Sequence, residues 1–296
     1  MRLAVAGAVM AGLAACGSSA PPGARAGVSP TSKVTATVRP SQPAASIPPA
    51  GTPSSTVSAA SPSARPSGTS RPSAGAPSVT GRLAGKDWTA IPATRRVVAL
   101  TFDAGANADA LPSILATLRR EGVPATFFLT GDFVRDFPAA ARSIAAAGFR
   151  IGDHTITHPY LTKLCDTKLC DAAVRHEILG GAQQIISVTG ANPAPLFRFP
   201  YGDADARTIA LANQAGYVPI RWTVDILGWE GNAGHISASI VAARVLAAAR
   251  PGEIVLMHVG SNPDDHTTFD ADALPQVISE LRAQGYSFVT LDALTG

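Results

Sequence analysis

The sequence predicts an α/β fold: a single barrel-like domain of about seven parallel strands, preceded by a disordered tether. From about Trp88 onward, short apolar runs alternate with Ala- and Leu-rich stretches of helical length, the pattern of βαβ units in a parallel sheet. From Gly17 to about Gly85, by contrast, Pro, Ser, Ala, Thr and Gly dominate. This stretch has too little apolar surface to offset the entropy lost on ordering, so we expect it to be disordered.

The first residues indicate a secretory signal, because Arg2 precedes an apolar run that ends at Ala15. The run is too short for a permanent transmembrane helix, which needs about 20 apolar residues. Its end, Leu13-Ala14-Ala15-Cys16, resembles a bacterial lipobox, in which the signal is cut before the cysteine and the thiol carries a diacylglycerol. An ordinary signal peptide with an accidental cysteine is the alternative. We therefore expect residues 1–15 to be a lipoprotein signal and Cys16 to anchor an extracytoplasmic protein to the cell membrane.

Residues 16–90 are expected to form the linker and residues 91–296 the folded domain. Proline favours an extended tether, and about 70 residues at about 3.1 Å each reach roughly 200 Å. Such a spacer would lift the domain into the cell wall, in agreement with the lipobox. Cys165 and Cys170 are an even pair in an exported chain, so we expect them to form a local disulfide. The net charge of +3 comes from scattered Lys and Arg, which does not indicate nucleic-acid binding.

Short apolar runs in the folded part have the length of buried strands. In chain order they are Val97–Phe102, Ala125–Leu129, Arg150–Asp153, Leu196–Phe199, Val218–Val224, Ile254–His258 and Phe288–Leu291. The stretches between them predict helices over Ala108–Glu121, Pro138–Ala147, Cys170–Thr189, Ala206–Ala215, Ile236–Ala249 and Ala273–Gln284. Gly122, Gly148 and Gly190 mark helix ends in this set. In a barrel of this kind, reactive groups collect at the C-terminal ends of the strands.

Five polar segments follow the ends of predicted strands. They are Thr101–Gly105, His154–Pro159, Arg198–Gly202, Trp222–Trp229 and Leu256–His258. Asp103 taken alone is explained as well by a helix cap or a turn. His154 and His158 stand four apart, a spacing that lets two imidazoles face a divalent metal. Each segment is weak evidence by itself, but chance or packing does not easily explain all of them at strand ends.

In this order, the segments resemble the five motifs of the NodB-homology polysaccharide deacetylases, carbohydrate esterase family 4. The resemblance covers about Arg96 to Leu291, essentially the whole folded part. It implies a deformed (β/α) barrel and a metal-dependent hydrolase that removes N-acetyl groups from a polysaccharide. The implied cofactor is a divalent ion, with Zn²⁺ as the first choice and Co²⁺ or another divalent ion as alternatives.

The resemblance also implies a role for each matching residue. Asp103 matches the general base, which takes a proton from the attacking water, and Arg198 matches the arginine that holds this aspartate. His258 matches the general acid that protonates the departing amine. His154 and His158 match the metal-binding histidines. Amide hydrolysis needs such parts, because the water must be activated and the amine is a poor leaving group.

The resemblance assigns the remaining matches to the substrate. Tyr201 would offer its backbone N–H to the oxyanion, while Trp222 and Leu256 match apolar positions around the acetyl methyl group. In the first motif, however, the family's second aspartate, a metal ligand, is replaced by Ala104.

A catalytic zinc usually keeps three protein ligands. The ligand that compensates for the alanine is left open between Asp103 itself, Asn107, Asp109 and Asp153.

The fourth motif normally carries an aspartate before its final tryptophan, where this chain has Gly228. In the family that carboxylate orients and charges the acid histidine, so its loss would lower the pKa of His258. Asp225, in the same motif, is the remaining candidate for this support or for substrate binding.

The leading hypothesis is a deacetylase of a cell-envelope glycan, with peptidoglycan amino sugars as first choice, because a tethered domain meets the wall first. One alternative is a deacetylase of another acetylated glycan, such as a chitin-like polymer, a biofilm glycan or an O-acetyl ester. A second is a catalytically weakened, glycan-binding wall scaffold. Ala104 and Gly228 favour the scaffold, whereas Asp103 and His258 favour catalysis. We expect the protein to be a monomer.

Overall fold

The computed structural model describes residues 78–164 and 170–296. The residues of the predicted signal peptide, the predicted lipidation site Cys16, most of the predicted linker and Cys165 lie outside the described residues. What the sequence analysis expects of them stays a prediction. Cys170 is disulfide-bonded. Among the residues described, no helix is both long and apolar enough to cross a membrane.

Residues 78–90, which the sequence analysis placed in the linker, include residues that pack on the folded domain. The Val79 backbone N–H donates to the Asn213 carbonyl at 2.9 Å. Trp88 forms a parallel β-bridge with Ile220 and packs on an apolar cluster of the domain. The folded domain therefore includes the last part of the stretch expected to be a tether.

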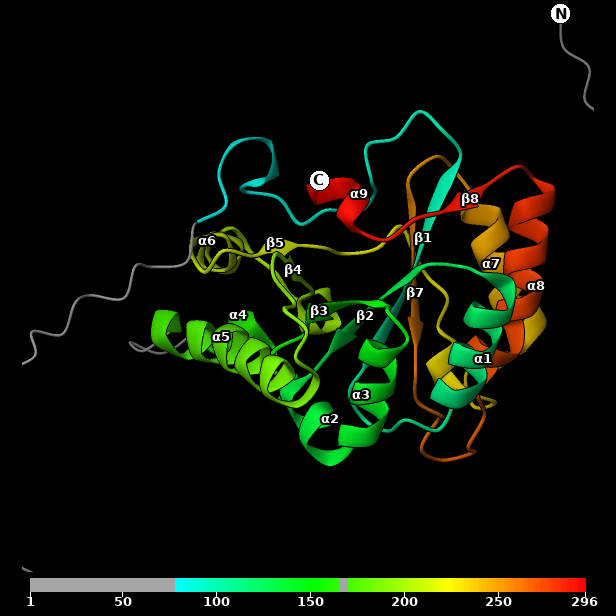
Figure 1. Cartoon of the computed structure of the whole chain (residues 1–296), viewed down its shortest axis with the longest axis horizontal. Helices are drawn as coiled ribbons and strands as arrows, with labels where there is room; N and C mark the ends of the chain where they lie inside the picture. The colour runs from blue at the N-terminus through cyan, green and yellow to red at the C-terminus, as the bar shows by residue number, and fades with distance from the viewer. Residues whose placement is uncertain (1–77, 165–169) are drawn as a thin grey trace, which may run out of the picture. The chain divides into compact units, whose positions relative to one another are not determined.

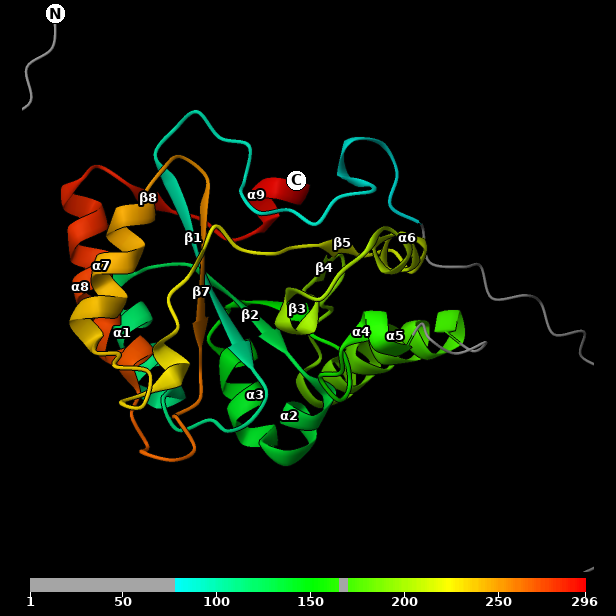
Figure 2. The same ribbon diagram turned by 180° about the vertical axis from the view of Figure 1, so that it is seen from behind.

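The strands form one parallel sheet in the order β5-β4-β3-β2-β1-β7-β6, and β8 pairs with the first residues of β1, on the edge opposite β7 (Figures 1 and 2). Their bounds are β1 Val97–Ala104, β2 Ala125–Leu129, β3 Arg150–Asp153, β4 Leu196–Phe197, β5 Val218–Pro219, β6 Val224–Asp225, β7 Glu253–His258 and β8 Ser287–Phe288. All of these pairs are parallel. The predicted fold class, a deformed and incomplete barrel of parallel strands, is confirmed.

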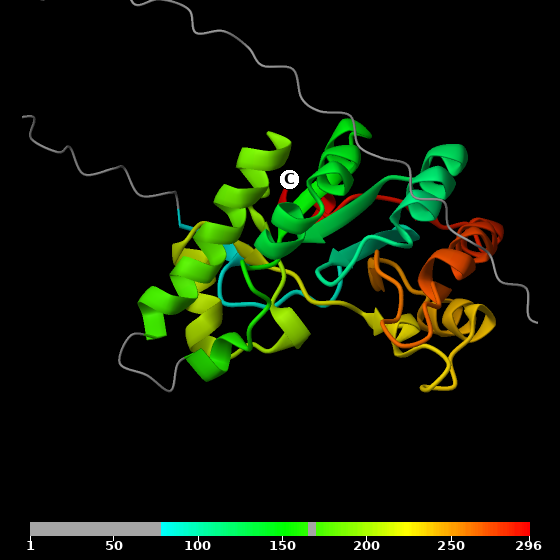
Figure 3. The same cartoon turned by 90° about the horizontal axis from the view of Figure 1, so that it is seen from below.

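Helices cover the outside of the sheet in two groups. Their bounds are α1 Leu111–Glu121, α2 Gly131–Asp136, α3 Pro138–Ala146, α4 Leu161–Leu164, α5 Cys170–Thr189, α6 Ala206–Gln214, α7 Ala238–Ala248, α8 Phe269–Ala283 and α9 Asp292–Thr295. One group packs α8 against α7 and α1 beside β1 and β7, and the other packs α5 against α2 and α3 (Figures 1 and 2). Figure 3 looks at the carboxyl ends of the strands, which the two groups flank.

Strand β1 forms the centre of the core, and every one of its residues is buried. Side chains alternate along a strand, so Leu100 and Phe102 enter the apolar cluster shared with the helices, where Phe102 stacks on Phe127 at 5.0 Å. Thr101 and Asp103 take the other face. The alternation therefore turns the carboxylate of Asp103 toward the inside of the curled sheet.

The predicted strand Val218–Val224 is divided in two, because the chain changes its hydrogen-bonding partner within it. The Ile220 N–H donates to the Phe197 carbonyl of β4, whereas the Thr223 N–H donates to the Ile254 carbonyl of β7. The segment thus crosses from one edge of the sheet to the other. The sequence also did not predict the short helices α2, α4 and α9. Helix α8 begins at Phe269 rather than Ala273, and the strand predicted over Phe288–Leu291 is β8, Ser287–Phe288.

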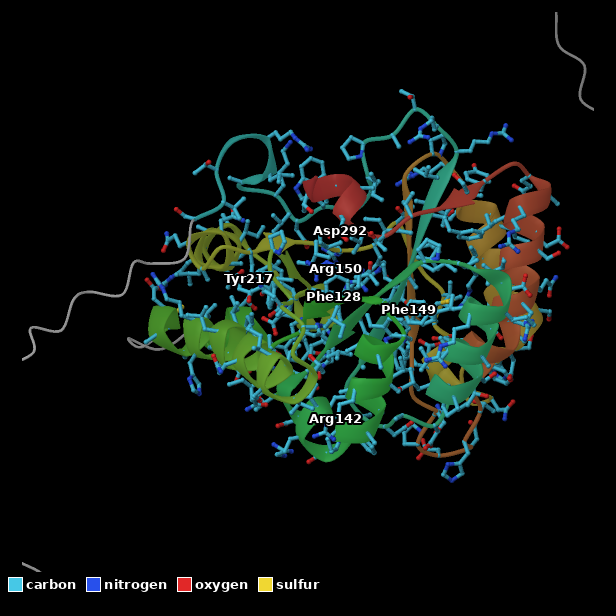
Figure 4. All side chains as sticks on the ribbon, viewed as in Figure 1. Phe128, Arg142, Phe149, Arg150, Tyr217 and Asp292 are labelled. Atoms are coloured by element: carbon cyan, nitrogen blue, oxygen red, sulfur yellow. The ribbon has the colours of Figure 1, made fainter. Side chains whose placement is uncertain are left out.

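At the amino end of β3, Arg150 joins separate parts of the chain, and Figure 4 labels it together with Asp292. The Arg150 Nε donates to Asp292 Oδ1 at 2.9 Å, and Nη2 donates to the Ala194 carbonyl at 2.7 Å. This end of the sheet is therefore held by structural contacts, which leaves the opposite, carboxyl end for the chemistry.

Candidate active site

A cavity of about 600 Å³ lies at the carboxyl ends of the strands. Its lining includes every residue predicted for the site except Arg198: Asp103, His154, His158, Tyr201, Trp222, Asp225, Leu256 and His258. The β1–β7 register pairs Asp103 directly with His258. The structure thus brings together residues that the sequence spreads over more than half of the chain.

Asp103 is a buried carboxylate with two basic neighbours. Its Oδ1 accepts a hydrogen bond from Nη1 of Arg198 at 2.7 Å, and its Oδ2 lies 3.4 Å from Nε2 of His154. Burial by itself would raise the pKa of Asp103, but the Arg198 guanidinium, with His154 and His258 nearby, holds that pKa below its usual range. The carboxylate is therefore kept ionised.

Arg198 stands behind the cavity wall and is fully buried. Its Nε donates to the Ile220 carbonyl at 3.1 Å and its Nη2 to the Arg221 carbonyl at 3.0 Å. The guanidinium also lies 4.2 Å from the centre of the Phe128 ring. Because Arg198 is fixed on several sides, it holds Asp103 in one position.

The two histidines line the cavity, and the pKa of each is lowered, so both rings are neutral. Nδ1 of His154 lies 2.8 Å from the carbonyl oxygen of Arg198. Since a carbonyl only accepts, Nδ1 carries the proton and Nε2 keeps its lone pair, which faces Asp103. The His158 ring meets His154 edge-on at 4.7 Å. Burial lowers the pKa of His154, and burial followed by the nearby His154 lowers that of His158 to about 3.

Imidazole nitrogens and a carboxylate oxygen, the donor atoms that His154, His158 and Asp103 offer, are of the types that bind a divalent ion such as Zn²⁺. A lone pair of His154 facing a carboxylate oxygen is unfavourable unless a cation lies between them. Zinc ligands at about 2.0–2.1 Å in a tetrahedron lie about 3.3 Å apart, and the distance from His154 Nε2 to Asp103 Oδ2 is 3.4 Å. Across residues 78–164 and 170–296, however, no three His, Cys, Asp or Glu side chains are already arranged to hold a metal.

Of the candidates left open for the third ligand, Asp103 has the best position. Asn107 and Asp109 both bind Ser261: Asn107 Oδ1 accepts from the Ser261 backbone N–H at 2.8 Å, and Asp109 Oδ2 accepts from its hydroxyl at 2.6 Å. Asp153 is fully buried and lies against α5, where a Cβ on Gly181 would be 2.5 Å from its Oδ1.

Glu177, which the sequence analysis did not single out, holds the loop that carries the histidines. From α5, its Oε2 accepts from the backbone N–H groups of Ile156 and Thr157, both at 3.0 Å. Thr155 and His158 have left-handed backbone conformations, with φ of 72° and 58°, which non-glycine residues rarely adopt. The sequence signal was an acid on a helix, which is too common to suggest this role.

Aromatic side chains line the cavity beside His158. Tyr201 has a left-handed φ of 60°, and its ring lies 4.5 Å from that of His158. The same ring stacks on Tyr160 at 4.0 Å, and both tyrosines are exposed. Trp222 and Leu256 supply apolar lining. Such a surface suits the apolar faces of a sugar and its acetyl group.

His258 is supported by Asp270, which the sequence analysis missed. Asp270 Oδ2 lies 3.5 Å from Nδ1 of His258 and accepts from the His258 backbone N–H at 2.7 Å. Burial would lower the pKa of His258, but Asp270, followed by Asp103 and Asp225, raises it above its usual value. Asp225, the candidate named from the sequence, accepts from the Leu227 N–H through Oδ1 and makes a smaller contribution.

The site therefore holds two groups whose environments move their pKa values apart. Asp103 is kept ionised, and His258 is kept protonated to a higher pH. Such a divergence is typical of a general base and a general acid that work together. Beside them lie two neutral imidazoles and an aromatic surface. The arrangement suits hydrolysis in which water is deprotonated and a leaving group is protonated.

Comparison with known proteins agrees with this chemistry. The sequence pattern of the family described as polysaccharide deacetylase matches residues 90–220. The chain is 33% identical over 203 residues to a peptidoglycan-N-acetylglucosamine deacetylase of Bacillus cereus, covering 69% of this chain and 70% of that protein. It is 37% identical over 207 residues to a chitooligosaccharide deacetylase of Rhizobium leguminosarum bv. trifolii, covering 66% and 90%. A further relative, the deacetylase PgdA of Listeria monocytogenes, is 36% identical, but the match spans only 40% of its length.

Solved structures give the same picture. The peptidoglycan N-acetylglucosamine deacetylase Bc1960 superposes with a TM-score of 0.62 at 32% identity, over 70% of this chain and 91% of that one. A pseudoenzyme of carbohydrate esterase family 4 from Bacillus anthracis, BA3943, superposes with a TM-score of 0.59 at 28% identity, over 69% and 66%. The fold is thus similar both to an active enzyme and to an inactive relative.

Proposed function

Because this chain belongs to the polysaccharide deacetylase family, we propose that it removes N-acetyl groups from the amino sugars of a cell-envelope glycan, with peptidoglycan as first choice. The observation that carries the proposal is the pair formed by Asp103 and His258 in one cavity. Their strands are paired in register, and their pKa values are displaced in opposite directions. A domain that only bound glycan would need neither displacement.

The reaction uses Asp103 as base and His258 as acid. Asp103, held by Arg198, takes a proton from water as the water oxygen attacks the acetyl carbonyl carbon. The bond from that carbon to the sugar nitrogen then breaks, and His258 gives its proton to the departing nitrogen. The products are acetate and a free amine on the sugar.

His154 and His158 would hold a divalent ion, with Asp103 Oδ2 as the nearest third donor. Such an ion, when bound, polarises the acetyl oxygen and lowers the pKa of water. The Tyr201 backbone N–H would add stabilisation by donating to the oxyanion. Trp222 and Leu256 would surround the acetyl methyl group.

Support for a glycan substrate comes from the relatives, which are deacetylases of peptidoglycan or of chitooligosaccharides. The choice of peptidoglycan rests on the predicted lipid anchor at Cys16 and the linker, which would place the domain at the wall. Replacement of the cysteine, Cys16→Ser, should abolish incorporation of labelled palmitate and release the protein from the membrane fraction. Unchanged labelling would remove the anchor from the proposal.

A catalytically weakened scaffold is the second candidate. Ala104 favours it, because this residue offers no donor atom and is buried among apolar neighbours. The likeness to the pseudoenzyme BA3943 favours it as well. Under this reading the protein would bind glycan through the aromatic lining of the cavity without releasing acetate.

The deciding experiment is acetate release from peptidoglycan fragments, with Zn²⁺ or Co²⁺ added and again after chelation. We expect release that stops on chelation and is abolished in Asp103→Asn. Asp132→Asn is the matched control, because Asp132 lines the same cavity but pairs with the exposed Arg135. If the protein binds peptidoglycan or chitooligosaccharides but releases acetate from neither, the scaffold hypothesis replaces the deacetylase hypothesis.

A further inference from the structure

Gly228 and Asp270 compete for the same space. A Cβ added to Gly228 would lie 1.5 Å from Oδ1 of Asp270 and 2.7 Å from its Cγ. No side chain at position 228 can coexist with the carboxylate in its present position. Asp270 comes from the first turn of α8, whereas Gly228 belongs to the 3₁₀ turn Gly228–Glu230 after β6. A side chain from either of two separate segments, the turn after β6 or helix α8, could therefore occupy the same space beside His258.

The carboxylate of Asp270 is directed at His258 and not at its own helix. Oδ2 accepts from the His258 backbone N–H at 2.7 Å and lies 3.5 Å from Nδ1 of the ring. Oδ1 is buried and has no hydrogen-bond partner among the described residues. A buried carboxylate without a positive neighbour is costly, and the imidazolium of His258 supplies that neighbour. The other acids near this ring are Asp103 and Asp225.

We propose that Asp270 is the positioning residue of His258, and that it fills from α8 the place that a carboxylate at position 228 would occupy. Only one of the two positions, 228 or 270, can then carry the carboxylate at a time. The glycine at position 228 does not mean that the carboxylate is lost, because Gly228 makes room for that of Asp270. The inference rests on the proposed function in one respect, since the task of His258 as acid belongs to that function.

The test exchanges the carboxylate between the two positions in the full chain. Asp270→Asn keeps an acceptor for the His258 N–H but removes the charge. In Gly228→Asp alone, the new Cβ would overlap Oδ1 of Asp270. This variant should therefore displace the Asp270 carboxylate and lower activity as much as Asp270→Asn. The double variant Gly228→Asp/Asp270→Ala moves the carboxylate to the other segment. Asp272→Asn is the matched control, because Asp272 lies on the same helical turn with its side chain exposed.

The first readout is the pKa of the His258 ring, measured by NMR in the metal-free protein, which needs no catalysis. We expect Asp270→Asn to lower this pKa by about 1 or more, the double variant to restore it, and Asp272→Asn to leave it unchanged. An unchanged pKa in Asp270→Asn would overturn the proposal even if the double variant failed to fold.

The second readout is the rate of acetate release. We expect Asp270→Asn to lower kcat by about 10- to 100-fold, part of the roughly 100- to 10,000-fold that general acid–base catalysis supplies, with little change in KM. Recovery in the double variant would support the exchange, because a merely structural role is not restored from another segment. A folded double variant with neither pKa nor kcat recovered would refute it. If the wild type releases no acetate, the proposed function fails, while the NMR arm still decides the inference.

Discussion

The buried pair of Arg198 and Asp103 gives the sharpest stability prediction. Replacement by methionine, Arg198→Met, keeps a long side chain against Phe128 but leaves Asp103 ionised, buried and without its partner. Breaking one side of a buried ion pair costs about 3–5 kcal/mol. The same change frees the Ile220 and Arg221 carbonyls, each of which adds about 1–3 kcal/mol if it stays buried and unpaired. The expected loss in the free energy of unfolding is therefore at least the cost of the broken ion pair, about 3–5 kcal/mol.

The assay is urea unfolding of the full chain at pH 7. With a slope of about 2–3 kcal/mol per molar urea, the midpoint should fall by about 1–2.5 M. The control is Arg207→Met, which breaks the Arg207–Asp171 pair, whose side chains are 55% and 53% exposed. An exposed pair contributes about 0–1 kcal/mol, so this midpoint should barely move.

The pH dependence has a defined sign. In the wild type the pKa of Asp103 lies below its usual value, so its stabilisation is present above the unfolded pKa of about 3.9 and is lost as pH falls through the folded pKa. In Arg198→Met burial acts unopposed by that guanidinium and raises the pKa. The deficit of the variant should therefore shrink as pH falls toward 4.

A double-mutant cycle measures the coupling between the two charges directly. Asp103→Asn/Arg198→Met removes both charges, so it should cost less than the sum of the single variants. Additive costs, or a midpoint for Arg198→Met as high as that of Arg207→Met, would refute the buried-pair reasoning.

Three further predictions concern the histidines, their loop and a buried acid. His154→Ala should lower the zinc bound per chain after dialysis, measured by metal analysis; unchanged content would remove His154 from the metal site. Glu177→Ala should cost about 1–3 kcal/mol in thermal unfolding, because two backbone N–H groups lose their acceptor, whereas Glu230→Ala at an unrelated turn should not. Glu253 is fully buried and its pKa is raised to about 7, chiefly by burial. Its stabilising protonation is complete below the unfolded value near 4.5 and is lost as pH rises through 7. Glu253→Gln should therefore raise the urea midpoint at pH 8 but not at pH 4, and equal shifts at both would contradict this assignment.

The sequence was sufficient for the parts of the fold that depend on local pattern. The strands Ala125–Leu129 and Arg150–Asp153 and the helix Cys170–Thr189 have the predicted bounds. Each is a continuous run of one secondary-structure type, with a pattern that does not change along its length. Val218–Val224 failed as one strand because its hydrogen-bonding partner changes within it, and apolar periodicity contains no information about partners.

In the site, too, some residues could be predicted from local pattern, whereas others depend on contacts between distant segments. Residues at the ends of strands, such as Asp103 and His258, could be predicted because parallel strands bring their carboxyl ends together. Asp270 was missed because its helix was expected to begin at Ala273, which left it in a loop. Acids in the first turn of a helix are a start signal, and Asp270 and Asp272 gave that signal. What they could not reveal is that Gly228, which has no side chain, leaves room for the Asp270 carboxylate beside His258.

The pairing of β1 with β7 also determines the stage of folding at which the active site is assembled. Asp103 and His258 are register partners, yet more than half of the domain is synthesised between them. Contacts of such long sequence separation form late, because closing the intervening chain costs entropy. A nascent or truncated chain that ends before β7 would carry the base and both imidazoles but no proton donor for the leaving amine. Acetate release would thus report completed folding, and fragments that end before β7 should release no acetate.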